Sequence, residues 1–155
     1  MTPERLNFIS EDPLSFLKQG LKLKTKIEIK QERIAFWRSK VESINIKLKP
    51  NKVSSTKPVS NTLETSVCSI VDLENDILAD IQELVRVEQE IKWAIDKLLI
   101  NPNHKLIFEM RYLNGLTLEE IAYKLKYALR WIQRLNKRAL NEMKVAAKSR
   151  VTLMA

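Results

Sequence analysis

Arginine, lysine and glutamine side chains gather in one helical segment near the end of the sequence. Arginine can bind O6 and N7 of guanine through two hydrogen bonds, and glutamine can bind N6 and N7 of adenine in the same way. Lysine and arginine also bind phosphate, which positions a protein on DNA without reading its sequence. We predict base contacts from Arg130, Gln133 and, as a third candidate, Arg134, and phosphate contacts from Lys126, Lys137, Arg138 and Lys144.

Two breaks in the helical pattern separate the elements that must position these side chains. Asn114-Gly115 is a helix stop of the kind that needs a left-handed residue. Thr117 then begins a second helix, and Glu120 three places on completes a T-x-x-E capping box. Thr117 is therefore a cap first, and the helix N-terminus that it caps is also a candidate phosphate contact.

The third helix is expected to begin near Ala128, after a short connection, and to be amphipathic. A short capped helix, a tight turn and a basic amphipathic helix form a helix-turn-helix, whose second helix can enter the major groove of DNA. Apolar residues at helical spacing predict its small core. This core should contain Ile107, Phe108, Leu113, Leu116, Ile121, Leu125, Ile132, Leu135 and Ala139.

The preceding residues predict two long helices that form an antiparallel hairpin. Apolar residues follow heptad spacing from Ile34 to Leu48, and again from Leu63 to Leu98. Residues 1–60 have a net charge of +7 and residues 61–100 a net charge of −6, so that pairing the two helices would balance charge. Glu74 and Glu88 interrupt the second seam, where they either pair with lysines of the first helix or stay solvated at its edge.

A second apolar stripe lies beside this seam, at Val71, Leu78, Val85 and Leu99. One stripe would suffice for one partner helix, so the wider face predicts self-association, with a homodimer formed through the hairpin. Cys68 lies next to the seam and is expected to be an inert packing residue.

The expected fold is all-α, a long antiparallel helical hairpin (coiled coil) followed by a three-helix unit. Pro102 marks the boundary between the two, because proline disfavours helix at the residue before it. The expected segments are a leader at 1–12, a hairpin at 13–100 with a loop near 49–62, a helix-turn-helix unit at 101–146 and a fraying tail at 147–155.

Composition limits the classes of function. No apolar run approaches the ~20 residues of a membrane span, and a single cysteine suits a reducing cytoplasm. The sequence offers no glycine-rich phosphate loop and no spacing typical of a metal site or a catalytic nucleophile, so we expect neither an enzyme nor a cofactor. His104 alone is expected to be a surface residue at a helix start. From residue 126 onward eight basic residues face one acidic residue, Glu142, which favours binding to nucleic acid.

The segment from Ile107 to Met143 resembles region four of bacterial primary sigma factors. The resemblance is carried by FEMRYLNGLTLEEIAYKL, where that family typically shows an apolar residue and Leu-Arg-Tyr, then a glycine turn and a capped Glu-Glu-Ile-Ala helix. Residues 60–146 are similar also to phage-encoded RinA/ArpU-like regulators of Gram-positive bacteria, through IVDLENDILADIQELV, MRYLNGLTLEEIA and KRALNEM. The resemblance implies a DNA-binding transcription regulator without enzymatic activity.

Three positions depart from the pattern of these families. Lys126 stands where they have glycine, and Ala128 where they have a capping serine or threonine. A lost cap costs about 0.5–2 kcal/mol, and a non-glycine residue in a left-handed turn costs roughly 1 kcal/mol more. Trp131 occupies a place common for polar contacts, and we expect it to pack inside the small domain rather than against DNA.

Three functions remain open at this stage. The first is a transcription regulator that binds double-stranded DNA at a specific sequence. The second is an adaptor that contacts RNA polymerase, with DNA affinity secondary, and the third is a small DNA-packaging subunit of a phage. The operator sequence and the choice between activation and repression do not follow from the residues.

Overall fold

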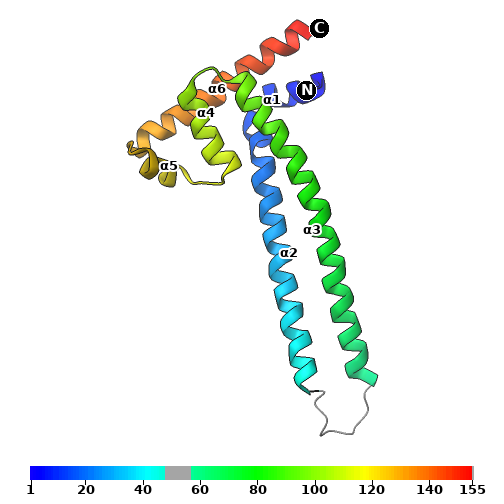
Figure 1. Ribbon diagram of the computed structural model, residues 1–155. Coiled ribbons are helices and arrows are strands. Elements are labelled where there is room, and N and C mark those ends of the chain that lie inside the picture. Colours follow the sequence, from blue (N-terminus) through cyan, green and yellow to red (C-terminus); the bar gives the residue numbers. More distant parts are fainter. Residues whose placement is uncertain (48–56, 155) are drawn as a thin grey trace. The chain divides into compact units, whose positions relative to one another are not determined.

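The computed structural model describes residues 1–47 and 57–154, and every regular element in them is a helix (Figure 1). The all-α fold with a long helix pair is therefore confirmed. None of these helices combines the length and apolar character needed to cross a lipid bilayer. The elements are α1 (Pro3–Glu11), α2 (Pro13–Lys47), α3 (Lys57–Leu98), α4 (Pro102–Phe108), the π-helix η1 (Glu109–Leu113), α5 (Leu118–Leu125) and α6 (Leu129–Met154).

The chain divides into two compact units, each described here by itself. The hairpin unit is Leu23–Glu83, and the terminal unit combines Met1–Lys22 with Leu84–Ala155. We had expected a boundary near Pro102, but the last turns of α3 already belong to the terminal unit. The reason is that the end of α3 is buried: Ile91, Ala94 and Ile95 are fully enclosed.

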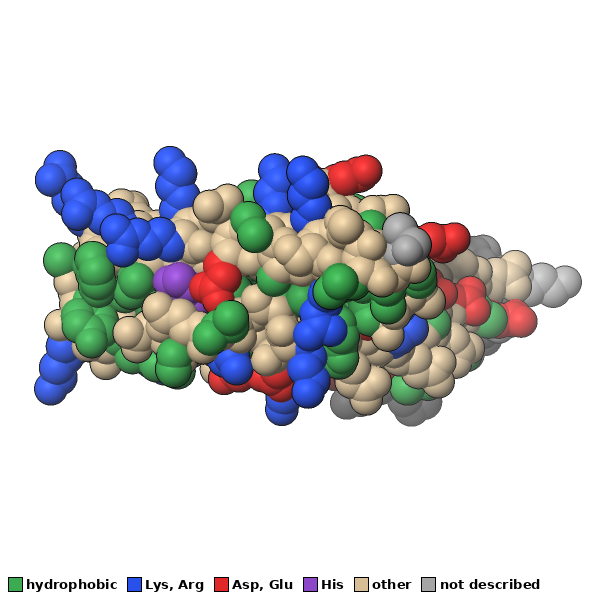
Figure 2. All heavy atoms as spheres, turned by 90° about the horizontal axis from the view of Figure 1, so that it is seen from above, with side chains coloured by type: hydrophobic (Ala, Val, Ile, Leu, Met, Phe, Trp, Pro, Cys, Tyr) green, Lys and Arg blue, Asp and Glu red, His purple; other side chains and the backbone are tan. Residues whose placement is uncertain are grey.

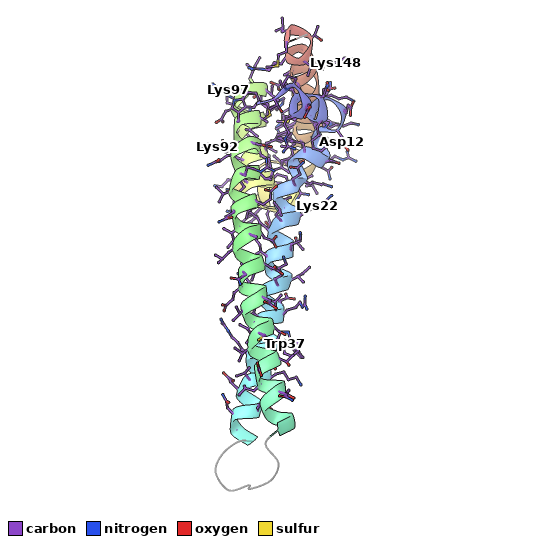
Figure 3. The ribbon with its side chains drawn as sticks, turned by 90° about the vertical axis from the view of Figure 1, so that its right-hand side faces the viewer. Asp12, Lys22, Trp37, Lys92, Lys97 and Lys148 are labelled. Carbon is purple, nitrogen blue, oxygen red and sulfur yellow. The ribbon has the colours of Figure 1, made fainter. Side chains whose placement is uncertain are left out.

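In the hairpin unit α2 and α3 run side by side in opposite directions (Figures 1 and 3). Two ion pairs fix this direction: Lys30 Nζ lies 2.6 Å from Asp80 Oδ2, and Arg38 Nη2 lies 3.2 Å from Glu74 Oε1. As the residue number rises along α2 from 30 to 38, the number of the paired residue on α3 falls from 80 to 74, so the two helices are antiparallel. In both pairs a basic residue of α2 meets an acidic residue of α3, as the opposite net charges of the two segments predict.

The buried seam of α3 is partly different from the one that the spacing predicted. Ile70 and Ile77 are half-buried as expected, but the other positions that share their face are Ser66, Leu73 and Asp80, which are buried or half-buried. Val67, Glu74 and Ile81, which the heptad pattern had assigned to the seam, are exposed instead. The pattern was ambiguous because two apolar stripes lie one residue apart on the same helix.

A polar pair therefore lies within the seam of the hairpin unit. The side chains of Lys30 and Asp80 are only 21% and 14% exposed, which is low for a charged pair. Removing one partner of such a pair leaves a desolvated charge, and a shifted register would do the same. This pair, rather than Glu74, is positioned to fix the register.

Glu74 lies at the edge of the seam, where it pairs with Arg38, and Cys68 is exposed rather than packed. Trp37, labelled in Figure 3, is half-buried in the seam of α2.

The first residues, expected to be a leader, form helix α1 instead. Thr2 caps the helix through its side-chain oxygen, which accepts a hydrogen bond from the Arg5 N–H, and Pro3 occupies the first turn. Leu6 and Ile9 are buried, and α1 packs against α6. The helix has only nine residues, from Pro3 to Glu11, which is too few for its periodicity to be recognised in the sequence.

Asp12 joins α1 to α2. Its carboxylate accepts hydrogen bonds from the N–H and the hydroxyl of Ser15, at 3.1 and 2.6 Å. The side-chain hydrogen bond from Ser15, followed by the backbone one, lowers the pKa of Asp12 below its ordinary value. This cap turns the chain at Pro13 and starts α2 where the sequence predicted a helix start.

Two other segments are more helical than expected. Helix α3 begins at Lys57, so the part of the expected 49–62 loop from 57 onward is helix; the rest of that loop, 49–56, lies outside the described residues. Residues 147–154, expected to fray, continue α6, and Ala147 is fully buried. The partner that keeps this end helical is α1, which the sequence had not indicated.

The two glycines are expected to respond in opposite directions to the same substitution. Gly20 lies inside α2, and a Cβ there would be 3.6 Å from Ile91 Cδ1, which is an ordinary contact. Gly20→Ala should therefore stabilise the fold by about 0.5–1 kcal/mol, because alanine loses less backbone entropy. Gly115 has φ +74°, so Gly115→Ala should destabilise by roughly 1 kcal/mol. Urea unfolding measures both, and destabilisation by Gly20→Ala would contradict the packing described.

Candidate nucleic-acid interface

The turn between η1 and α5 is built from the chain reversal at Gly115. Helix η1 ends with the Asn114 N–H donating to the Glu109 carbonyl at 3.0 Å, five residues back, which is π-type geometry. Gly115 then takes the left-handed conformation, and the Leu116 N–H donates to the Met110 carbonyl at 3.0 Å. The Arg111 guanidinium donates to the Leu116 carbonyl, also at 3.0 Å. The predicted glycine stop is confirmed.

The start of α5 is the capping box that the sequence predicted. The Glu120 N–H donates to Thr117 Oγ1, and the Thr117 N–H donates to the Glu120 carboxylate, both at 3.2 Å. Thr117 is exposed, but its hydroxyl is occupied by this cap. The contact of this helix end with phosphate stays a prediction.

The turn into α6 has the irregular chemistry that Lys126 and Ala128 imply. Lys126 adopts φ 58° and ψ 40°, the left-handed conformation that glycine favours. The Tyr127 N–H donates to the Ala122 carbonyl at 3.0 Å, which closes the end of α5. At the start of α6 the Ala128 carbonyl accepts from the N–H groups of Trp131 and Ile132, and alanine offers no side chain to cap the remaining donors.

Replacing Lys126 by glycine should stabilise the terminal unit by about 1 kcal/mol, because glycine adopts the left-handed conformation without steric cost. Lys126→Ala is the matched control, since alanine removes the charge but keeps the cost. Thermal unfolding should rank glycine above alanine and wild type, which should be nearly equal. If the two variants had the same stability, the left-handed turn would not be strained.

Helix α6 is anchored by a buried apolar face. Ile132, Ala139 and Met143 are fully enclosed, and Leu135 is nearly so. They pack in the terminal unit with α4 and α5, where Phe108 and Tyr112 meet edge to face with centroids 5.1 Å apart. Burial raises the pKa of the Tyr112 hydroxyl above its ordinary value of 10.0, because the anion would be desolvated. The hydroxyl thus stays neutral and can donate hydrogen bonds within the core.

All eight side chains that the sequence assigned to DNA are exposed. At about 100° per residue, Arg130, Arg134 and Lys137 follow the middle of the outward face of α6. Gln133 and Lys144 lie toward one edge of this face, and Arg138 toward the other. Figure 2 shows lysine and arginine side chains projecting from the terminal unit. Helix α6 therefore brings six of the eight residues to one surface, while Lys126 and Thr117 lie on the two turns before it.

Trp131 corrects one expectation. Instead of packing inside the small domain, its side chain is 39% exposed. The Arg138 guanidinium lies over the indole ring, 5.8 Å from its centroid, in a cation–π contact. Trp131 thus holds a basic side chain at the edge of the outward face, a role that the spacing of seven residues between them could have suggested.

His104 corrects another expectation, because it is 7% exposed rather than on the surface. Its Nδ1 lies 2.5 Å from Glu142 Oε2, and the Ile100 N–H donates to Glu142 Oε1 at 2.6 Å. Figure 2 shows the histidine beside an acidic side chain. Burial alone would raise the pKa of Glu142, but the hydrogen bonds from Ile100 and His104 and the charge of His104 lower it overall.

The contact of Glu142 with His104 and Ile100, which we call the α4 junction, has an electrostatic consequence. Glu142 is the one acidic residue after position 125, and its carboxylate is held by the start of α4 rather than directed outward. The outward face of α6 therefore carries basic charge that no acid of the same helix neutralises.

At the far end of α6, Arg150 connects this helix to α3. Its guanidinium lies over the ring of Trp93 on α3, 5.5 Å from the ring centre, in a cation–π contact.

Residues 86–144 match the family model of sigma-70, region 4. The chain thus carries a sigma region-four-like helix-turn-helix, as the resemblance implied. The match covers less than half of the chain and begins in α3, close to the start of the second segment of the terminal unit at Leu84. No curated protein and no solved structure matches the chain.

Proposed function

We propose that this protein is a sequence-specific, double-stranded-DNA-binding transcription regulator without enzymatic activity, and that α6 enters the major groove. The observation that carries the proposal is the outward face of α6, where Arg130, Gln133 and Arg134 are exposed above a fully buried apolar face. A helix anchored on one side and rich in bidentate donors on the other has the chemistry of a recognition helix.

The proposal divides the face into two kinds of contact. Arg130, Gln133 and Arg134 read base edges, and they lie in the first two turns of α6, where recognition helices make their base contacts. Lys126, Lys137, Arg138 and Lys144 bind phosphate. Arg138 is held against Trp131, so that it makes its contact at a lower entropic cost than a freely rotating arginine.

Selection of bound sequences from random double-stranded DNA tests the proposal directly. We expect enrichment of one short motif, and an affinity for it that falls steeply with salt because phosphate contacts release counterions. Enrichment of no motif, together with equal affinity for all duplexes, would contradict sequence-specific regulation.

Two finer points belong to the same proposal. We propose that two copies pair through the hairpin unit, which the exposed apolar side chains of α3 support. The similarity of residues 60–146 to RinA/ArpU-like regulators supports an origin in a phage or prophage. Light scattering tests the first point, since a monomer at micromolar concentration would contradict it.

One observation favours a second candidate function, an adaptor that contacts RNA polymerase. The hairpin unit exposes large apolar side chains on both helices, including Ile29 and Phe36 on α2 and Leu78 on α3. Such surfaces are typical of protein–protein contacts when they are contiguous. Recovery of RNA polymerase by the purified protein, without a specific DNA footprint, would decide for the adaptor.

A further inference from the structure

One face of α2 in the hairpin unit carries basic and apolar side chains in a single row. Ile29 and Phe36 are large and apolar, yet they are 51% and 54% exposed. Exposed cations alternate with them at steps of three and four residues, so the row has heptad spacing and no acidic member. We call this set the α2 row, and its members are Lys26, Ile29, Arg33, Phe36 and Lys40.

The positive charge of the α2 row is directed away from α3 of the same chain. The ion pairs between the two helices come from Lys30 and Arg38, which lie outside the row. Within the row, Lys40 Nζ lies 5.4 Å from the centre of the Phe36 ring, in a cation–π contact. The α2 row therefore combines positive charge with exposed apolar surface, and it fits a partner helix that is acidic and apolar.

The outward side of α3 has this complementary chemistry. Between residues 58 and 85 the sequence has six acidic residues and no lysine or arginine. The exposed apolar residues of this part of α3 also follow heptad spacing, with an exposed glutamate among them. We call this set the α3 stripe, and its members are Val67, Val71, Glu74, Leu78 and Ile81.

In the antiparallel direction the two sets match residue by residue. The members of the α2 row at 29, 33 and 36 are separated by four and then three residues, and so are the members of the α3 stripe at 78, 74 and 71. One register therefore places each apolar residue opposite an apolar residue and the arginine opposite the glutamate. The facing pairs are Ile29 with Leu78, Arg33 with Glu74, and Phe36 with Val71.

This contact would repeat between chains the one that α2 and α3 already make within a chain. There too the helices are antiparallel, and basic residues of α2 meet acidic residues of α3. Glu74 binds Arg38 of its own chain through Oε1, and its side chain is 49% exposed. A carboxylate has a second oxygen that accepts hydrogen bonds, so Glu74 can also bind an arginine from outside.

The α2 row and the α3 stripe lie on opposite sides of the hairpin unit. A groove between the helices marks the side of the α3 stripe, because Glu74 lines it together with Gln31, Ala35 and Arg38 of α2. At about 100° per residue, these three residues lie on the face of α2 opposite the α2 row. One copy therefore cannot use both sets on the same neighbour.

We propose that the α2 row of one copy packs antiparallel on the α3 stripe of a second copy, with Arg33 beside Glu74. The proposal rests on the pairing of copies through the hairpin unit, and it names the two faces that meet. A contact between two different faces is heterologous. A pair of copies keeps one free α2 row and one free α3 stripe, so further copies can add until a ring closes.

The faces are tested by light scattering with two variants, each of which loses one set. Phe36→Glu places a carboxylate against the acidic α3 stripe, and Leu78→Lys places an ammonium against the basic α2 row, so like charges meet in both. Wild type should have the mass of two or more copies, and each variant alone the mass of one. A mixture of the variants in equal amounts should form a dimer, because the intact α3 stripe of the first binds the intact α2 row of the second.

Two exposed positions outside both sets provide matched controls. Ile46→Glu on α2 and Ala79→Lys on α3 introduce the same charges and should keep the mass of wild type. Circular dichroism should show the same helix content in all four variants, because each substituted residue is exposed. Wild-type mass for Phe36→Glu or Leu78→Lys, or a mixture that stays monomeric, would overturn the proposed faces.

These outcomes are separate from the outcomes for the proposed function. A monomeric wild type would contradict pairing through the hairpin itself, whereas a Phe36→Glu variant of wild-type mass would contradict only the faces assigned to it. The masses are measured without DNA, and all the substituted residues belong to the hairpin unit. Selection of a DNA motif by α6 is therefore tested independently.

Discussion

Gln133→Ala is expected to reduce the discrimination between the selected DNA motif and a motif changed at one base pair by about 10- to 100-fold. The expectation follows from the bidentate contact of a glutamine with adenine, which is worth ~1–3 kcal/mol of discrimination. Gln133 is exposed on α6, one residue after the fully buried Ile132, so its truncation removes a contact without opening the core. Competition binding with matched and mismatched duplexes measures the change.

Lys137→Ala is the control for this prediction. Lys137 lies on the same face of α6, but a single ammonium on phosphate carries no sequence information. The variant should bind every duplex more weakly by a similar factor, and the slope of log affinity against log salt should become shallower by about 1. Identical behaviour of the two variants would contradict the division into base and phosphate contacts.

The sequence predicted the helix-turn-helix well because its signals are local. The left-handed Gly115, the Thr117–Glu120 capping box and the left-handed Lys126 each follow from a few neighbouring residues. The inward positions of α6 follow from helical spacing alone. The exposure of the six predicted contact residues on α6 is the complement of that spacing.

Predictions failed where a distant segment decides the outcome. Helix α1 packs against α6. Neither α1 nor the last turns of α6 could therefore be predicted to be helical from their own residues, and both segments were expected to be irregular. His104 was expected on the surface because its partner, Glu142, lies thirty-eight residues away. In the hairpin the heptad spacing was correct for Ile70 and Ile77, but it could not tell which of two adjacent stripes faces α2.

Glu142→Ala is expected to destabilise the terminal unit by about 1–3 kcal/mol. The carboxylate accepts hydrogen bonds from the Ile100 N–H and from His104, whose side chain is buried. Removing it leaves a buried donor without a partner, which costs more than the hydrogen bond itself contributes. Asn141→Ala is the matched control, because Asn141 is the exposed neighbour on α6, and its effect should stay within ~0.5 kcal/mol.

The dependence on pH follows from the lowered pKa of Glu142. In the unfolded chain this carboxyl has its ordinary pKa of 4.5, and in the folded protein its pKa is lower. The stabilisation is therefore complete above the unfolded pKa and is lost as the pH falls through the folded pKa. The difference in unfolding free energy between wild type and Glu142→Ala should shrink as the pH falls below 4.5. A difference that grew on acidification would mean that the carboxylate is destabilised in the folded protein, and that the junction with α4 does not hold it.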